Sequence, residues 1–333
     1  MRDLERRYRQ LLRAYPAGYR QARGAEIVGT YLDLAGPDRR RPSILDAADV
    51  LAGGGRERLR AAGAADLLPG VRLAAILSHV TATALAGFWA AAEVVTTSGA
   101  WGAPAFGPFA TTGVVVWAGW LLAAIVHALA PASWGRMAIG LALLLTVAVM
   151  PVAALFELPR PFLFVLLPQA TLGLLALAVP SEATRPLRLM PLAVAPAAAL
   201  IAVGVLSGRS AWFYRFGNGG AFLPEAGAVL LLTAMLAAAA LSLRGDARGL
   251  WALLVLLTPV GLLALYPLTE IIVPLVGAGH ADFRVITGTA AAIFVAGGMT
   301  LAAALAISRR SHPSATPTIA AIGLHDRCPT CGR

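Results

Sequence analysis

The C-terminal run of residues 325–332 has residue types and a spacing suited to metal binding. Cys328 and Cys331 follow the CPxCG pattern of a zinc knuckle, in which two thiolates hold one tetrahedral ion. A structural zinc site needs four ligands. His325 or His312 could supply a third ligand, or the tails of two subunits could together supply four thiolates. Zinc at this knuckle is one hypothesis, and a redox pair or a tail with two reduced thiols is the alternative.

Two histidines and a glutamine lie within long uncharged runs. His79 and His127 each lie roughly 5–10 Å from the same end of their runs, at about 1.5 Å per helical residue, on consecutive antiparallel helices. They could form a pair or relay protons, or each could bond to a nearby backbone carbonyl. Gln169 lies about 10 Å from the opposite end of its run and is expected to form a hydrogen bond between helices.

Five acidic residues are expected at the opposite ends of these helices. Glu93 and Glu270 each lie about twenty residues, or roughly 30 Å, beyond the basic end of their runs, so neither is expected at mid-membrane. Together with Glu157, Glu225 and Asp282 they could form an acidic rim that binds a cation or a basic ligand. Simple solvation of each helix end is the alternative.

No pattern of catalytic residues accompanies these groups. The chain contains no hydrolase elbow, no HExxH motif and no dinucleotide fingerprint, and a chain without lysine cannot carry a P-loop. A lipid-modifying enzyme would need histidines clustered with acids at one interface, and only His79 and His127 approach that pattern. We therefore predict a non-enzymatic protein, with zinc at the knuckle as its only candidate cofactor.

Long apolar runs must hold these residues in place. With 58% apolar residues, 13% charged residues and a mean hydropathy of +0.74, the chain lies outside the range of soluble domains, which carry about 25% charged residues. A run of about twenty apolar residues spans the roughly 30 Å hydrocarbon core of a bilayer as a helix. The chain contains eight such runs, at residues 73–92, 109–130, 137–156, 162–179, 189–207, 226–243, 250–269 and 285–307. Prolines at residues 151, 168, 196, 259 and 267 fall inside the runs and predict kinks.

The arginines fix the expected orientation. All 27 basic residues are arginine, which together with abundant alanine suggests a high-GC bacterium. Of these, 23 fall on the side that carries residues 1–72, and four, Arg160, Arg209, Arg215 and Arg284, fall on the other. The positive-inside rule predicts a bacterial plasma-membrane protein with both termini in the cytoplasm. A basic inner face attracts anionic lipid, so membrane lipid rather than nucleic acid is the expected partner of this charge.

The first 66 residues predict a small helical head. They contain 13 arginines and nine acids in place of continuous apolar runs. Three helices are expected, the first ending near Pro16, the second covering about residues 18–35, and the third starting at a capping box of Ser43 and Asp46. Three successive glycines, at residues 53–55, are expected to weaken the third helix. The expected domains are a cytoplasmic head at residues 1–70, a transmembrane bundle at 71–308 and a flexible cytoplasmic tail at 309–333.

The first helix is amphipathic and carries one candidate contact stripe. Tyr8, Leu11, Leu12 and Tyr15 recur at helical spacing. The stripe could bind a cytoplasmic partner, or it could be buried within the head itself.

The head also resembles a known type of region. Its segments YRQLLRAYP (residues 8–16), GYRQARGAEIVGTYLD (18–33) and SILDAADVLAGG (43–54) precede an apolar bundle. This layout is similar to HAAS-type regions, short helical domains of bacterial membrane proteins associated with PadR-family transcription regulators. The resemblance implies that the head docks a cytoplasmic winged-helix regulator while the bundle anchors it or senses membrane stress.

These observations favour one interpretation and leave another open. The expected fold is all-α, a polytopic membrane protein of about eight transmembrane helices with a three-helix cytoplasmic head. The expected function is sensory or regulatory, with the head docking a cytoplasmic partner or the inner leaflet. A small-molecule transporter or permease is the alternative, supported by the number of runs and their prolines but lacking a detectable internal repeat. A homo-oligomer is compatible with either interpretation.

Overall fold

The protein is helical throughout the part of the chain that the structure describes. The computed structural model describes residues 2–35, 39–97, 109, 111–180, 182–207, 222–275 and 282–311, and these contain no β-strand. Contacts divide the chain into two compact units, one comprising Met1–Ala65 and Ala302–Arg333 and the other Asp66–Leu301. They are called unit 1 and unit 2 below.

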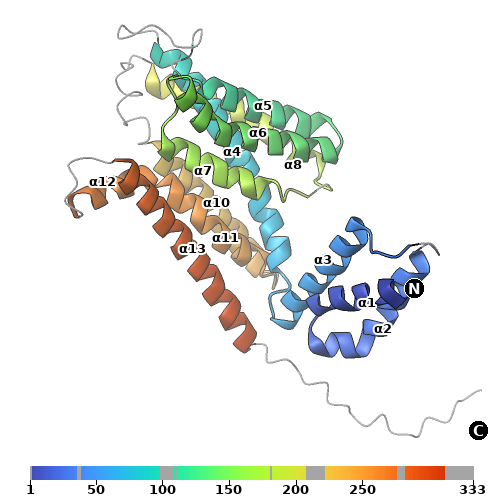
Figure 1. Ribbon diagram of the computed structural model, residues 1–333. Helices are drawn as coiled ribbons and strands as arrows, with labels where there is room; N and C mark the ends of the chain where they lie inside the picture. The colour runs from blue at the N-terminus through green and yellow to red at the C-terminus, as the bar shows by residue number, and fades with distance from the viewer. Residues whose placement is uncertain are drawn as a thin grey trace, which may run out of the picture. The chain divides into compact units, whose positions relative to one another are not determined.

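The N-terminal part of unit 1 contains three α-helices and a short 3₁₀ turn (Figure 1). These are α1 (Arg2–Leu11), η1 (Leu12–Ala14), α2 (Ala17–Leu34) and α3 (Ile44–Ala61). Stacked tyrosines contribute to a small core. The ring centroids of Tyr8 and Tyr31 lie 5.3 Å apart, a distance at which aromatic rings attract each other. The buried residues of this core are Leu4, Tyr8, Leu12, Tyr15, Val28 and Val50.

Acidic residues of α3 hold the tyrosines of unit 1 in position. The Tyr8 hydroxyl donates to Asp46 at 3.1 Å, and the Tyr31 hydroxyl donates to Asp49. The hydrogen bond to Asp49 raises the pKa of Tyr31 to about 12. Burial, together with the Asp46 carboxylate, raises the pKa of Tyr8. Both phenols are therefore neutral donors at physiological pH.

Helix α3 begins as the sequence predicts and continues where the sequence predicts weakness. The predicted capping box is confirmed, because the Ser43 hydroxyl accepts from the Asp46 amide and the Asp46 carboxylate accepts from the Ser43 amide. Residues 53–55, which are expected to weaken this helix, do not interrupt it, since α3 runs to Ala61. A Cβ at Gly54 would lie 2.6 Å from that of Ala14, so glycine here lets α3 approach η1.

Unit 2 is built around one long helix, α4 (Leu67–Thr97), which Figure 1 shows among the other helices of the unit. It contacts α5, α7, α8, α10 and α11. Small residues allow the closest contacts, and a Cβ at Gly87 of α4 would lie only 2.3 Å from the carbonyl oxygen of Ala195 on α8. The other helices are α5 (Gly113–Leu129), α6 (Ala132–Leu155), α7 (Leu163–Ala176), α8 (Arg185–Leu206), α10 (Leu223–Ser242), α11 (Arg248–Leu263), α12 (Leu265–Leu275) and α13 (Phe283–Ser311), and the residues of α13 from Ala302 on belong to unit 1.

Five described helices are long and apolar enough to cross a membrane. They are α4, α6, α8, α10 and α13, and the bent pair α11 and α12 makes a sixth if it counts as one span. Each of the eight predicted apolar runs coincides with a helix or a helix pair, but α5 and α7 have only 17 and 14 residues. The structure therefore shows a membrane-type helical protein with five or six candidate spans.

The pair α11 and α12 is a broken helix. The two segments meet at an angle of 63°. Pro267 lies three residues after Ala264, the residue between the segments, and it has no amide hydrogen with which to bond the carbonyl of Leu263. A proline that sequence analysis expects to kink this run thus lies beside the bend.

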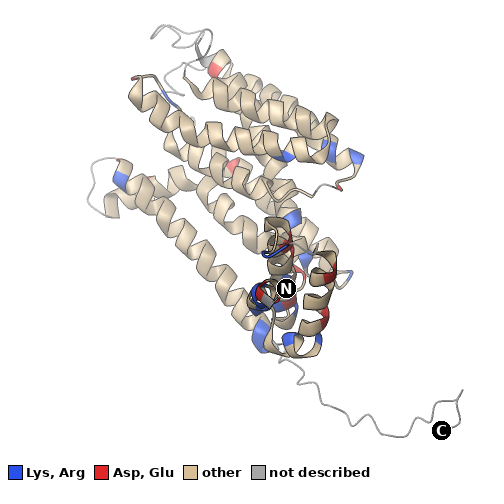
Figure 2. Ribbon diagram, turned by 45° about the vertical axis from the view of Figure 1, so that its right-hand side comes forward, with Lys and Arg blue, Asp and Glu red and all other residues tan. Residues whose placement is uncertain are grey.

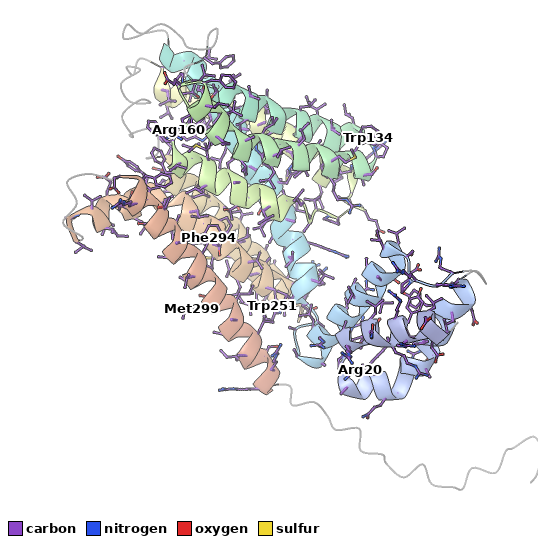
Figure 3. All side chains as sticks on the ribbon, viewed as in Figure 1. Arg20, Trp134, Arg160, Trp251, Phe294 and Met299 are labelled. Atoms are coloured by element: carbon purple, nitrogen blue, oxygen red, sulfur yellow. The ribbon has the colours of Figure 1, made fainter. Side chains whose placement is uncertain are left out.

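Charge and apolar exposure are distributed as a lipid-facing protein requires. Figure 2 shows charged residues frequent in α1–α3 and sparse along the helices of unit 2, where they gather near helix ends. Large apolar side chains of α13, such as Phe294 and Met299 in Figure 3, are 46% and 67% exposed. Such exposure suits contact with acyl chains rather than with water.

Candidate functional site, a buried histidine pair

The structure brings His79 of α4 and His127 of α5 together inside unit 2. Their ring centroids lie 5.0 Å apart in an edge-to-face arrangement, and only 1% of His79 and 8% of His127 is exposed. Trp120, two turns before His127 on α5, has its ring centroid 6.4 Å from that of His79. The two imidazoles therefore meet in a largely enclosed environment.

Several buried polar atoms on and near this stretch of α4 have no hydrogen-bond partner among the described residues. They are both ring nitrogens of His79, the hydroxyl oxygen of Ser78 and the amide oxygen of Gln169. Gln169 is fully buried on α7, and its amide nitrogen donates to the carbonyl of Ala82 on α4 at 3.0 Å. This contact is the interhelical hydrogen bond that its sequence position suggests. A buried polar group without a partner costs free energy of folding. Polar atoms retained here at that cost make this region a candidate functional site.

A small cavity lies against both imidazoles. It has a volume of about 10 Å³, and its lining also includes apolar side chains of α4 and α8. A space of roughly 10–15 Å³ is enough for one buried water molecule. The cavity is therefore large enough for one small donor or acceptor beside the rings of His79 and His127, and for nothing larger. Its lining residues are Ile76, His79, Val80, His127, Val179, Ala183, Leu187 and Pro191.

An arginine fixes the end of the helix that carries His127. Arg188, on the first turn of α8, donates from Nε to the carbonyl of His127 at 3.0 Å and from a terminal nitrogen to the carbonyl of Ala130. These carbonyls lie at the C-terminal end of α5, where a cation also interacts favourably with the helix dipole. The guanidinium therefore holds the end of α5, and its charge lies near the histidine pair.

The histidine pair is an arrangement on which a proton would have a large effect. Within the described residues, no carboxylate bonds to either ring of the pair, and no group of three metal-ligating side chains occurs. A proton on either ring would place a charge in an apolar site near a second imidazole and Arg188. Protonation would thus favour any helix arrangement in which the rings reach water.

Comparison of the chain with protein-family models, with curated proteins and with solved structures gave no match. The function is therefore inferred from the chain's own residues. The residues of the metal-binding hypothesis, His325, Cys328 and Cys331, lie outside the part of the chain that the structure describes.

The contact stripe expected on the first helix is mostly interior to unit 1. Tyr8, Leu12 and Tyr15 are 1%, 5% and 9% exposed and belong to the core of the unit, while Leu11 packs partly buried against it. The structure thus favours the alternative of burial within the head for these residues. The exposed large apolar side chains of α2 and α3 are Leu34, Ile44, Leu45 and Leu51.

Sequence analysis missed the burial of Glu93. This side chain, expected at a solvated helix end or in an acidic rim, is fully buried. Its Oε1 accepts from the Thr111 hydroxyl at 2.8 Å and from the Trp117 indole nitrogen at 2.9 Å, while Oε2 accepts from the Thr111 amide at 3.3 Å. Glu93 therefore fastens the end of α4 to the start of α5, and it does not belong to an exposed rim. The other four acidic residues are exposed: Glu157, Glu225, Glu270 and Asp282.

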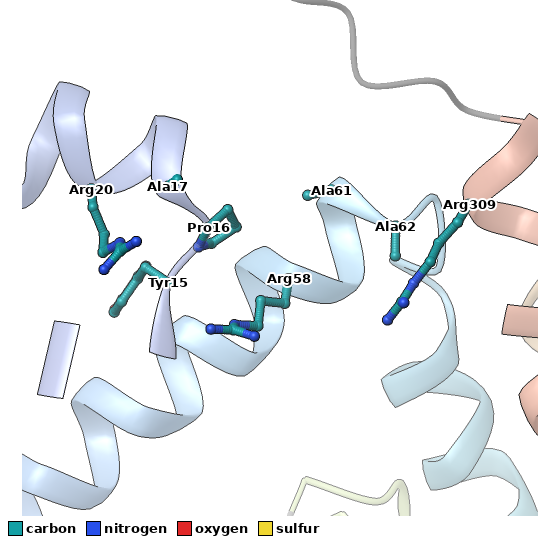
Figure 4. A pocket seen from close by; sticks show the side chains of 8 residues that line it. All are labelled: Tyr15, Pro16, Ala17, Arg20, Arg58, Ala61, Ala62 and Arg309. Carbon is teal, nitrogen blue, oxygen red and sulfur yellow. The ribbon is translucent and has the colours of Figure 1, made fainter. Parts of the chain in front are cut away.

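Unit 1 contains a basic hollow, shown in Figure 4. It measures about 440 Å³ and includes three arginines. Arg58 donates from Nε to the carbonyl of Ala14 and from Nη2 to that of Arg13 at 2.6 Å. Part of the positive charge in this hollow thus serves to fasten α3 to η1. The lining residues are Tyr15, Pro16, Ala17, Arg20, Arg58, Ala61, Ala62 and Arg309.

Proposed function

We propose that the protein is an integral membrane protein of sensory or regulatory role, in which the His79–His127 pair is the element that changes state. The observation that carries this proposal is a nearly fully buried imidazole with two unbonded nitrogens, 5.0 Å by ring centroid from a second imidazole. Intramembrane ionisable residues are costly and are commonly functional. In water, histidine is also the side chain whose charge changes most readily near neutral pH.

In this proposal eight helical segments cross the plasma membrane and both termini are cytoplasmic. Helices α5 and α7 are short for a span, with 17 and 14 residues, and would cross with the help of flanking residues or local thinning of the bilayer. The 23 to 4 partition of arginines supports this orientation. A tag at either terminus should be accessible only after cells are permeabilised, and labelling of a tag on intact cells would contradict the topology.

Protonation of the pair is the proposed stimulus. His79 of α4 faces His127 of α5, and Arg188 of α8 bonds to the carbonyl of His127. Neither contact supplies a negative charge that would stabilise a protonated imidazole. Acidification of the cytoplasm would therefore shift the population toward an arrangement in which α4, α5 and α8 separate around the pair.

Tryptophan fluorescence of the purified full-length protein tests this element. Because Trp120 lies beside His79, and because an apolar site disfavours a charged imidazole, lowering the pH from about 8 to about 3 should change its emission in the wild type. The change should be absent from His79→Leu and from Trp120→Phe, while His312→Leu, in the tail, should retain it. An identical response in the wild type and His79→Leu would refute the proposal.

In this proposal unit 1 passes the signal on through a surface that binds another molecule. We assign this surface to an exposed apolar group on α3, formed by Ile44, Leu45 and Leu51. Ile44 and Leu45 are 88% and 81% exposed, and exposed apolar groups of neighbouring side chains commonly mark interaction surfaces. Solvent is an unfavourable environment for such a group, so a second apolar surface is expected to cover it.

Basic residues beside this group favour the inner leaflet as its partner. The exposed arginines at residues 39–41 immediately precede the apolar group. Arg39 forms an ion pair with Asp46 at 3.1 Å, so Arg40 and Arg41 carry the charge that is available to a partner. Apolar side chains beside arginines match an anionic lipid surface, to which each arginine contributes about 1 kcal/mol.

Trypsin accessibility separates leaflet docking from partner docking. The peptide bonds after Arg39 and Arg40 should be cleaved more slowly in full-length protein in anionic nanodiscs than in phosphatidylcholine nanodiscs. Leu45→Asp should remove this protection, and Leu34→Asp serves as a matched exposed apolar control. Equal cleavage in both lipids contradicts leaflet docking. Protection that requires an added winged-helix regulator would instead support the partner implied by the resemblance to HAAS-type regions.

A permease is the second candidate, and the broken helix favours it. Discontinuous helices form binding sites in many transporters, and α11 and α12 meet at 63°. The histidine pair would then lie on a proton path. Proteoliposomes with a proton gradient and a pH-sensitive dye distinguish the two candidates, because a sensor leaves the gradient intact whereas a proton-coupled carrier dissipates it.

A further inference from the structure

A polar hollow in unit 2 combines two arginines and a glutamate from three separate segments. It measures about 210 Å³ and is lined by Arg72, Arg136 and Glu182 together with residues 177–180. Arg72 comes from α4, Arg136 from the first two turns of α6, and Glu182 from the connection between α7 and α8. Helix packing thus brings together charges that lie far apart in the sequence.

The two guanidinium groups of this hollow are not committed to the protein itself. Neither the Arg72 nor the Arg136 side chain forms a hydrogen bond or an ion pair with another described residue. By contrast, Arg188 donates to backbone carbonyls and Arg248 pairs with Asp246. The two arginines outweigh Glu182, so the hollow carries a formal net charge of +1 and has two guanidinium groups whose donors have no acceptor among the described residues. The hollow therefore has the charge of an anion-binding site.

The position of the hollow along the helices indicates a lipid. Arg72 and Arg136 are each the last charged residue before a long uncharged stretch, since the next charges along the chain are Glu93 and Glu157. Trp134, labelled in Figure 3, is 59% exposed and lies two residues before Arg136. Tryptophan is enriched at the depth of the headgroups. The hollow would consequently open at headgroup depth once the helices lie in a membrane.

Apolar side chains on the same helices could accompany the acyl chains of such a lipid. Met137 and Leu141 of α6 are 65% and 52% exposed, and Leu174 of α7 is 61% exposed. Helices α6 and α7 contact each other. A headgroup in the hollow would therefore have exposed apolar surface on the adjoining helices for its acyl chains.

We propose that Arg72, Arg136 and Glu182 form a binding site for the phosphodiester headgroup of a phospholipid. The inference rests on the proposed membrane location. Arginine binds phosphate oxygens through two parallel hydrogen bonds, and two arginines can grip one phosphate from different helices. The Glu182 carboxylate accepts hydrogen bonds from the distal end of the headgroup, such as a glycerol hydroxyl or an ammonium. A hollow of 210 Å³ holds about seven water volumes of roughly 30 Å³ each, which suits a headgroup but not a whole lipid.

Native mass spectrometry of the full-length protein in detergent tests this site, with phosphatidylglycerol as the probe. The wild type should retain one tightly bound lipid, and Arg72→Gln/Arg136→Gln should bind it about tenfold or more weakly, a loss of roughly 1.4 kcal/mol or more. Arg160→Gln/Arg284→Gln removes the same charge from the opposite helix ends and should bind as the wild type does. The single variant Arg136→Gln, at an exposed position, should show a smaller loss and serves if the double variant does not fold.

Three results would overturn the assignment. The first is equal binding by the wild type and Arg72→Gln/Arg136→Gln, and the second is an equal loss in the control Arg160→Gln/Arg284→Gln. The third is displacement of the bound lipid by millimolar inorganic phosphate, which would assign the hollow to free phosphate rather than to a headgroup.

The glutamate has a separate readout. Glu182→Gln should weaken phosphatidylglycerol relative to phosphatidic acid, whose headgroup has no distal hydroxyl, and an equal effect on both lipids would remove Glu182 from the site. The accessibility of terminal tags is independent of all these outcomes, so a failed lipid site is distinguishable from a failed topology.

Discussion

Replacing Glu93 by leucine should destabilise the protein by about 3 kcal/mol. The carboxylate is fully buried and accepts from the Trp117 indole, the Thr111 hydroxyl and the Thr111 amide. The hydroxyl can rotate to another acceptor, whereas the indole and the amide stay buried without a partner. Each orphaned donor costs about 1–3 kcal/mol, so the two together cost roughly 2–6 kcal/mol. Relief from burying the carboxylate offsets part of this loss.

Thermal unfolding in detergent, followed by tryptophan fluorescence, measures the effect. For a chain of this size 1 kcal/mol corresponds to roughly 2 °C, so Tm should fall by about 6 °C in Glu93→Leu. Glu93→Gln should fall about half as far, because an amide oxygen still accepts from the indole. Glu270→Leu, at an exposed carboxylate of α12, is the matched control and should change stability by less than about 0.5 kcal/mol. The reasoning is refuted if Glu93→Leu and Glu270→Leu unfold at the same temperature.

Four further substitutions test other parts of the structure. Arg188→Leu, which uncovers the last carbonyls of α5, should cost about 1–3 kcal/mol in thermal unfolding, and a change below about 0.5 kcal/mol would show that the carbonyls find other donors. Gly87→Ala should lower Tm because its Cβ meets the Ala195 carbonyl, whereas Gly204→Ala, with nothing within 4 Å, should raise Tm because alanine favours a helix by up to about 1 kcal/mol. Hydrogen bonds from Ser43 hold the pKa of Asp46 below its usual range, so the stabilising effect of Asp46 is complete above about pH 4 and is lost as the pH falls through the folded value. Circular dichroism of acid unfolding should show this loss in the wild type and a smaller one in Ser43→Ala.

Local patterns in the sequence already indicate the helices and their ends. Twenty uncharged residues after Arg72 predict a helix long enough for a bilayer, and α4 extends from Leu67 to Thr97. The Ser43 capping box needs only residues three apart, so the chain specifies it without tertiary contacts. The rise per residue also puts His79 and His127 at one depth of neighbouring helices. That argument does not say whether their rings face each other.

The candidate site depends on helix rotation, which the apolar runs leave open. A helix that is apolar on every face can turn any of its faces toward protein or toward lipid. Hydropathy therefore does not indicate which side chains of neighbouring helices contact each other. Glu93 shows the consequence, because a carboxylate near a helix end is expected to be solvated until Thr111 and Trp117 are placed around it. In the sequence, Arg188 is notable only because it borders an apolar run. The carbonyls that accept its hydrogen bonds lie about sixty positions earlier, so the sequence does not indicate this contact.

Hydrophobic runs are enough to specify a bundle of apolar helices, and the placement of arginine predicts its orientation in a membrane. Those properties follow from the cost of placing charge and unpaired backbone groups in hydrocarbon, a cost that each segment bears alone. Helix packing adds what no single segment contains: two imidazoles that meet, an enclosed Glu93, and a hollow shared by Arg72 and Arg136. These contacts depend on the rotation of each helix and on the angle at which neighbouring helices cross. Close approaches between helices, such as that of Gly87 to Ala195, fix both.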